Sequence, residues 1–154
     1  MCIKERTIKT PIGKIGIRAD ENGVCALVFR PAGDQNDASP LLDRAQRELE
    51  EYFAGRRRDF SVPLSIAGTP FQQKVWRALR AIPYGETRSY GEIAKAIGND
   101  KAARAVGMAN NKNPLPVFIP CHRVIGAGGR LTGYAGGLEI KKILLEIEGI
   151  HAEI

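Results

Sequence analysis

Residues that build disulfide frameworks and metal sites are scarce in this sequence, which has three cysteines and two histidines among 154 residues. The odd number of cysteines argues against a secreted disulfide scaffold, and no CxxC pair occurs. A structural zinc ion normally needs four ligands, and His151 is the only histidine that does not adjoin a cysteine. We therefore expect no metal site, and we interpret Cys2 as a terminal residue and Cys25 as a small buried hydrophobe.

Long apolar runs are also missing. No stretch approaches the roughly 18 apolar residues that a membrane-spanning helix needs. The first ten residues, MCIKERTIKT, are charged and lack the apolar core of a signal peptide. We therefore expect a cytoplasmic protein of a prokaryotic cell, with no membrane association. The composition, 44% hydrophobic and 26% charged, is that of an ordinary globular protein with one large or two small domains.

Negative charge is scarce in the middle of the chain. Residues 76–130 contain nine basic and three acidic residues, so this segment has a net charge of +6, equal to that of the whole chain. A positive field concentrated in one segment favours a polyanionic partner, nucleic acid first. A solvated basic face is the other interpretation.

The first third of the chain has the pattern of a small β-sheet with one helix. Turn-forming residues at 11–13 and 20–23 separate short β-branched runs within residues 6–30, which predicts three antiparallel strands. Residues 41–54 then show helical periodicity. We expect an N-terminal α/β domain over residues 1–64.

Helices dominate the expected C-terminal domain, residues 65–154. An N-cap followed by proline predicts a helix over residues 70–81, and a reciprocal capping pattern predicts a second over residues 89–98. Further helices are expected over residues 99–110 and 138–148. The second and third helices, joined by a tight turn with glycine, form a helix-turn-helix pattern.

The third predicted helix has few of the long polar side chains with which a major-groove helix contacts base edges. Alanines and a glycine at positions 102, 103, 105, 107 and 109 surround the single long side chain of Arg104. Such a slim helix fits the minor groove, where Arg104 is able to reach between bases. Packing of the alanines against the next helix explains the pattern equally well.

The octapeptide IPCHRVIG places Cys121 directly before His122 in the basic segment. A cysteine is a strong nucleophile only as the thiolate, and a nearby histidine accepts its proton directly or through water. A coincidence of core packing is the alternative. A cysteine protease usually takes its cysteine and histidine from distant parts of the sequence. An adjacent pair after a helix-turn-helix therefore indicates a cysteine that acts on DNA.

The same octapeptide is similar to the active-site signature of the O6-alkylguanine-DNA alkyltransferases, also called methylated-DNA–protein-cysteine methyltransferases. The similarity extends from about Thr69 to Gly149 and includes TPFQQKVWRALRAIPYGETRSYGEIA, AARAVGMANNKNPLPVFIPCHRVIG and GYAGGLEIKKILLEIEG. The resemblance implies an α+β fold. A three-stranded antiparallel sheet with a helix, resembling ribonuclease H, precedes a mostly helical domain with a winged helix-turn-helix-like DNA-binding motif.

The resemblance also implies DNA repair by direct reversal, without a cofactor. An alkyl group on O6 of guanine, or less well on O4 of thymine, passes irreversibly to Cys121 in a single turnover. The partner is alkylated double-stranded DNA, with the lesion flipped out through the minor groove. The protein is expected to be a monomer, with several molecules able to bind along the DNA.

The family's catalytic roles fall on five residues of this sequence. Cys121 is expected to be the nucleophile. His122 is expected to take its proton through a water molecule while Glu148 holds the imidazole. Tyr90 is expected to protonate guanine N3 as the leaving group departs, and Asn113 to be the hinge between the recognition helix and the cysteine loop.

The remaining implied roles concern binding. Arg104 is expected to fill the space that the flipped nucleotide leaves. DNA contacts are expected from Tyr90, Ala103, Arg104, Ala105, Ala109 and Arg123, and the pocket for the flipped base from Val124, Tyr134, Ala135 and Gly136.

Three other functions fit parts of the pattern. An alkyltransferase-like lesion-binding protein marks damage without transfer, but it lacks the nucleophile that Cys121 supplies here. A helix-turn-helix regulator with a redox-sensing cysteine needs base-reading side chains on its recognition helix. A thiol hydrolase releases its acyl group and turns over repeatedly.

Overall fold

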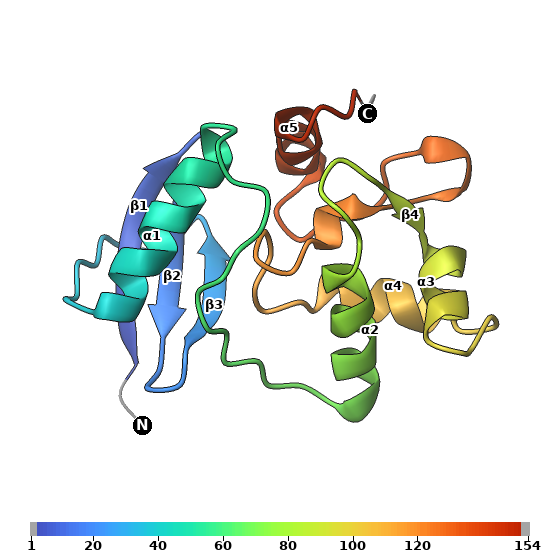
Figure 1. Cartoon of the computed structure of the whole chain (residues 1–154), viewed down its shortest axis with the longest axis horizontal. Helices are drawn as coiled ribbons and strands as arrows, with labels where there is room; N and C mark the ends of the chain where they lie inside the picture. The colour runs from blue at the N-terminus through green and yellow to red at the C-terminus, as the bar shows by residue number, and fades with distance from the viewer. Residues whose placement is uncertain (1–2, 152–154) are drawn as a thin grey trace. The chain divides into compact units, whose positions relative to one another are not determined.

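A computed structural model describes residues 3–151 of the chain, and a turn at residues 11–12 and a bend at residues 21–23 separate its first three strands. An antiparallel sheet is formed, in this order, by β1 (Lys4–Thr10), β2 (Gly13–Ala19) and β3 (Val24–Phe29) (Figure 1). Gly13 starts β2 directly after a tight turn with a φ of +93°, which glycine adopts without strain. Ile15 and Ile17 of β2 are fully buried, so one face of the sheet belongs to the core.

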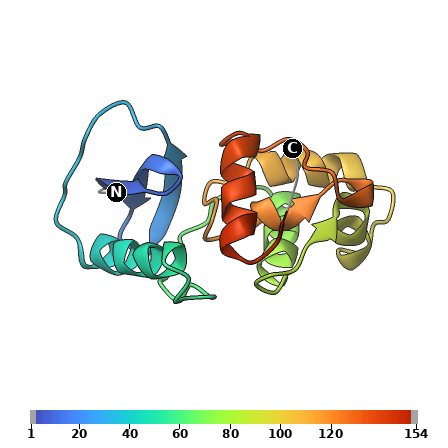
Figure 2. The same ribbon diagram turned by 90° about the horizontal axis from the view of Figure 1, so that it is seen from above.

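One helix, α1 (Pro40–Phe53), packs against all three strands (Figure 1 and Figure 2). Its N-cap is Ser39, whose hydroxyl oxygen accepts a hydrogen bond from the amide of Leu42. Leu42 and Leu49 are fully buried on the helix face that meets the sheet. The strands and the helix predicted from the first third of the sequence are confirmed.

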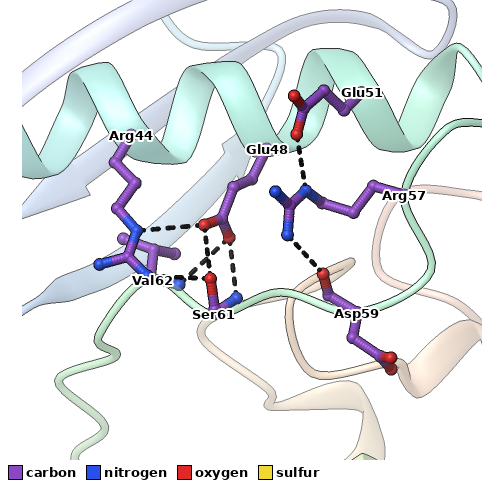
Figure 3. Close-up of polar contacts among 7 residues, drawn as sticks. All are labelled: Arg44, Glu48, Glu51, Arg57, Asp59, Ser61 and Val62. Carbon is purple, nitrogen blue, oxygen red and sulfur yellow. Dashed lines mark hydrogen bonds and ion pairs between the residues drawn. The ribbon is translucent and has the colours of Figure 1, made fainter.

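A buried carboxylate fastens the segment after α1 to the helix (Figure 3). Glu48 is only 1% exposed, and its Oε1 atom accepts hydrogen bonds from the amides of Ser61 (2.9 Å) and Val62 (3.1 Å). Its Oε2 atom accepts from the Ser61 hydroxyl (2.9 Å) and from Nε of Arg44 (3.1 Å). These four bonds satisfy a carboxylate that would otherwise be costly to bury.

The chain divides into two compact units, Met1–Ala67 and Gly68–Ile154. The helices of the second unit are α2 (Pro70–Arg80), α3 (Tyr90–Ala96), α4 (Ala103–Asn111) and α5 (Leu138–Ile147). Its short elements are β4 (Arg88–Ser89), η1 (Cys121–Arg123), β5 (Val124–Ile125) and η2 (Ala127–Gly129). β4 and β5 pair in parallel, which brings the start of α3 beside the residues that follow η1.

Capping residues determine where two of these helices begin, as predicted. Thr69 and Ser89 each accept a hydrogen bond at an N-terminus and complete a reciprocal capping box, at α2 and α3 respectively. The predicted start of the third helix at Asn99-Asp100 is wrong. The amide of Ala102 bonds to the Asn99 carbonyl in a turn, so α4 begins only at Ala103.

The helix-turn-helix is formed by α3 and α4, and α2 supports it. The indole N–H of Trp76 in α2 donates a 2.9 Å hydrogen bond to the carbonyl of Ala109 in α4. The sheet-and-helix unit followed by the helical unit confirms the predicted α+β fold class. Within residues 3–151, no helix is both long and apolar enough to cross a bilayer.

Candidate active site around Cys121

Cys121 begins the short turn η1 at the end of a strained apolar loop. In this loop Val117 has a φ of +75°, and such a conformation costs a β-branched residue of order 1–3 kcal/mol. Asn113 holds the loop on both sides of Val117. Its amide nitrogen donates to the Ile119 carbonyl (2.8 Å), and its amide oxygen accepts from the Leu115 N–H (2.9 Å). The loop presents Cys121 with 4% of its surface exposed.

The imidazole of His122 pairs with the carboxylate of Glu148, which caps the end of α5. His122 Nε2 lies 2.6 Å from Glu148 Oε2, and both side chains are fully buried. Arg123 donates to the same carboxylate through Nε (2.8 Å) and Nη2 (3.1 Å), and to the Ile82 carbonyl through Nη1 (2.7 Å). The Gly85 amide adds a 3.0 Å bond, so the orientation of the carboxylate is determined by several donors.

The position of Arg123 differs from the expected one. The sequence pattern assigned Arg123 to the DNA surface, but its side chain is buried and turned towards Glu148. A buried carboxylate needs a charged or hydrogen-bonding partner, and Arg123 supplies it. The expected DNA contact of Arg123 is therefore corrected to a structural role beside the His122–Glu148 pair.

Burial is the largest influence on the ionisation of Cys121 and His122. Burial raises the pKa of the Cys121 thiol, and hydrogen bonds with Asn113 and Tyr134 and the charge of Lys141 offset this only in part. Burial also lowers the pKa of His122, and its carboxylate partner opposes this only in part. Both shifts favour a neutral thiol beside a neutral imidazole.

Lys141 belongs to the site although the sequence analysis did not assign it there. Its side chain is fully buried in α5, and its Nζ atom donates to the carbonyls of Val124 (2.6 Å) and Thr132 (2.9 Å). Burial lowers the pKa of Lys141 to about 8. A sequence signal did exist: Lys141 stands at helical spacing with Leu144 and Leu145 on the apolar face of its helix.

Tyr90 reaches the site through the pairing of β4 with β5. It is the first residue of α3, and its hydroxyl oxygen lies 2.7 Å from Oγ1 of Thr132. Gly107 of α4 lies against the ring; a Cβ atom there would make ordinary contacts of 3.7 Å with two ring carbons. The expected pocket residues lie on β5 and in the segment before α5: Val124 and Gly136 are buried, Tyr134 is half-buried and Ala135 is exposed.

The recognition helix α4 has an exposed and a buried side. Arg104 and Ala105 are exposed and Ala103 is half-buried, whereas Ala109 is only 3% exposed. The small residues of this helix therefore fall into two groups, one facing the surface and one packed inside. Ala109 packs inside and lies off the expected DNA surface. Met108, which the sequence analysis did not select, is 64% exposed on this helix.

Cys25 is half-buried in β3, so it is less buried than expected, and Cys2 is outside the described residues. In the part of the chain that the structure describes, no three His, Cys, Asp or Glu side chains are grouped closely enough to hold a metal ion.

Both units match families of known proteins. Residues 70–150 match the DNA-binding domain of 6-O-methylguanine DNA methyltransferase, and residues 3–66 match the ribonuclease-like domain of the same proteins. Together the two matches include nearly the whole chain.

Individual relatives agree with these matches. The chain is 51% identical over 148 residues to the methylated-DNA–protein-cysteine methyltransferase of Methanosarcina acetivorans, covering 92% of this chain and 95% of the relative. It is 50% identical over 155 residues to the constitutive enzyme of that name from Bacillus subtilis, covering 94% of each. The crystal structure of Mycobacterium tuberculosis OGT in complex with DNA superposes with a TM-score of 0.84 at 47% identity, covering 95% of this chain and 93% of that one. The chain therefore belongs to the 6-O-methylguanine DNA methyltransferase family.

Proposed function

We propose that this chain reverses alkylation damage by moving a methyl or larger alkyl group from O6 of guanine in duplex DNA to its own Cys121. O4-alkylthymine is a poorer substrate of the same reaction. The observation that carries the proposal is the buried sequence Cys121-His122, with His122 paired to Glu148 in the unit that contains the helix-turn-helix. The thioether product is stable, so each molecule reacts once and requires no cofactor.

The chemical step is a displacement at the alkyl carbon. A bond forms between this carbon and the Cys121 sulfur, while the carbon–O6 bond breaks and leaves its electron pair on guanine. His122 takes the thiol proton through a water molecule, and Glu148 stabilises the resulting imidazolium. Tyr90 donates its hydroxyl proton to guanine N3, so the purine departs without a negative charge.

The ionisation of the site suits a reaction that starts only when a lesion is bound. Burial keeps Cys121 and His122 neutral, so the thiolate forms as the proton moves to the imidazole. Because His122 and Glu148 are fully buried, the carboxylate stabilises the imidazolium more strongly than it would in bulk water.

The exposed side of α4 supports docking in the minor groove. Arg104 and Ala105 are exposed there, and small side chains let the helix backbone approach the narrow groove. Base flipping costs a few kcal/mol, and the Arg104 guanidinium offsets part of this cost by occupying the vacated position. Asn113 then serves as the hinge between α4 and the cysteine loop, and the base enters between Val124 and Tyr134–Gly136.

The protein is proposed to act as a monomer, with further molecules able to bind along the same DNA. The relatives come from archaea and bacteria, which supports action in the cytoplasm of a prokaryotic cell.

Mass spectrometry tests the proposal directly. After incubation with duplex DNA containing O6-methylguanine, the peptide with Cys121 should gain one methyl group per protein molecule. Cys121→Ala should bind the duplex with unchanged affinity and gain no methyl group. An unchanged mass in the wild-type protein would leave a lesion-binding protein, and repeated turnover would indicate a hydrolase.

A further inference from the structure

The side chain of Thr132 contacts Tyr90, and none of the roles described above explains this contact. Its hydroxyl oxygen is 2.7 Å from the Tyr90 hydroxyl oxygen, in a half-buried position. The contact joins the first residue of α3 to the segment between η2 and α5, across 42 positions of the sequence. Its distance is that of a good hydrogen bond between two hydroxyl groups.

The main chain of Thr132 is held independently of this bond. Its carbonyl accepts a 2.9 Å hydrogen bond from Nζ of Lys141, which also donates to the Val124 carbonyl. Through these two hydrogen bonds the buried ammonium group joins the segments around Val124 and Thr132, which bear the expected pocket residues. The Lys141 contact therefore determines the position of the Thr132 backbone beside Tyr90.

The side chain of Thr132 is oriented by a glycine. A Cβ atom on Gly126 would lie 2.9 Å from Cγ2 of Thr132, a distance that ordinary packing does not allow. Gly126 has a φ of −72°, so the space, and not the backbone conformation, is what requires glycine here. With the methyl group in that space, the hydroxyl group of Thr132 faces Tyr90.

We propose that Thr132 is a positioning residue for the alkyl transfer, because its hydroxyl group holds Tyr90 ready to donate a proton to the flipped base. This inference rests on the proposed function. A tyrosine hydroxyl has one proton and an oxygen that also accepts. When Tyr90 gives its proton to guanine N3, the Thr132 hydroxyl donates to the Tyr90 oxygen and stabilises the charge that develops there. The phenolate then takes a proton from water and the His122 imidazolium gives one to water, so the protein ends with only the S-alkyl group added.

The first experiment compares valine and serine at this position in single-turnover transfer from O6-methylguanine duplex. Thr132→Val keeps the shape and removes the hydroxyl, so the rate constant at saturating protein should fall about tenfold, the effect of one hydrogen bond to a developing charge. Thr132→Ser should stay within about threefold of wild type. Thr87→Val is the matched control, since the Thr87 hydroxyl has no hydrogen-bond partner within residues 3–151. A wild-type rate in Thr132→Val would overturn the inference.

A double-mutant cycle separates positioning from simple loss of structure. Tyr90→Phe should lower the rate constant about 100-fold, within the usual range for a general acid. Adding Thr132→Val to Tyr90→Phe should lower it no further, because Thr132 acts through the tyrosine hydroxyl. An additional tenfold loss in the double variant would mean that Thr132 acts elsewhere, and the inference would fail.

The packing against Gly126 provides an independent test. Gly126→Ala should slow transfer by displacing Thr132. Adding Thr132→Ser should restore part of the rate, because serine lacks the Cγ2 methyl group, whereas the Arg130 carbonyl oxygen stays 3.3 Å from the added Cβ atom. Absence of this rescue would contradict the orientation argued here. In every arm, methylation of wild-type Cys121 is measured in parallel. A wild-type protein that gains no methyl group refutes the proposed function, whereas normal transfer in Thr132→Val refutes only the role of Thr132.

Discussion

Glu148 Oε2 lies 2.6 Å from His122 Nε2 in the protein interior, although the two residues are 26 positions apart in the sequence. The same carboxylate accepts two hydrogen bonds from Arg123 and one from the backbone. Glu148 thus does two separate things: it orients the His122 imidazole, the proposed base, and it neutralises the buried guanidinium of Arg123.

Glu148→Gln should impair both transfer and stability. The amide does not stabilise an imidazolium, so the transfer rate should fall about 100-fold or more. Arg123 loses its buried counterion, which should lower the free energy of unfolding by about 3–5 kcal/mol. Chemical denaturation and single-turnover transfer measure the two effects. Glu146→Gln, an exposed neighbour in the same helix, should change neither. Wild-type transfer in Glu148→Gln would contradict the role given to the carboxylate.

The pH dependence of transfer should reflect the lowered pKa of His122. Burial lowers this pKa below its usual 6.5, so the imidazole remains an unprotonated base at pH 6.5 and loses this function only under more acidic conditions. Single-turnover rates should therefore decline on acidification with a midpoint below pH 6.5. A decline centred above pH 6.5 would show that the base is exposed or is another group.

Lys141 should impose its own pH dependence on stability. The folded protein releases the Lys141 proton near pH 8, whereas the unfolded chain retains it to about 10.5. Across this window the unfolded state binds more protons, so the free energy of unfolding should rise with pH. Lys141→Met should lack this contribution, so the free energy of unfolding of the wild type minus that of the variant should rise from pH 8 to 10. Lys142→Met is the control; a difference that stays constant with pH would argue against burial of the ammonium.

The N-terminal unit should lose stability in acid because of the buried Glu48 carboxylate (Figure 3). Burial alone raises the pKa of Glu48, but hydrogen bonds from Ser61, Val62 and Arg44 outweigh it and lower the pKa below 4.5. The stabilisation is therefore present above pH 4.5 and disappears as the pH falls through the folded-state pKa. Glu48→Gln should cost about 1–3 kcal/mol at pH 7 and progressively less in acid. Urea denaturation at several pH values measures this.

The control for Glu48 is Glu50→Gln, an exposed carboxylate of the same helix. It should leave the stability at pH 7 within about 0.5 kcal/mol of wild type. If Glu48→Gln and Glu50→Gln behave alike, the buried hydrogen bonds do not stabilise the unit.

Arg104 should matter for DNA and not for the chemistry of the thiol. Arg104→Ala should slow repair of duplex O6-methylguanine by about tenfold or more, because flipping loses its stacking partner, and should leave reaction with the free base unchanged. Arg104→Lys keeps the charge but not the planar group, so it should recover binding more than repair. If Arg104→Ala slows the reaction equally with duplex and with free base, Arg104 does not act in base flipping.

Local patterns of the sequence determined the elements of this protein. Each of the signals used acts over only a few residues: the turns before β2 and β3, the caps Thr69 and Ser89, and the apolar spacing of α1. Such signals can be recognised in the sequence because they depend on neighbouring residues and short-range hydrogen bonds. The resemblance to the family was likewise readable in the sequence, because IPCHRVIG and the stretches on either side of it, from about Thr69 to Gly149, match the family's pattern in order and spacing.

Contacts between distant segments were decided only by the tertiary structure. Arg123 and Lys141 are residue types that usually lie at the surface. In the fold Arg123 is buried against Glu148, and Lys141 is buried with its ammonium group on two carbonyls. Ala109 turns inward while Ala105 stays exposed, and Thr132 meets Tyr90. The physical reason is the same in each case. Whether a polar side chain is buried depends on partners that the fold brings together, and a run of neighbouring residues does not contain them.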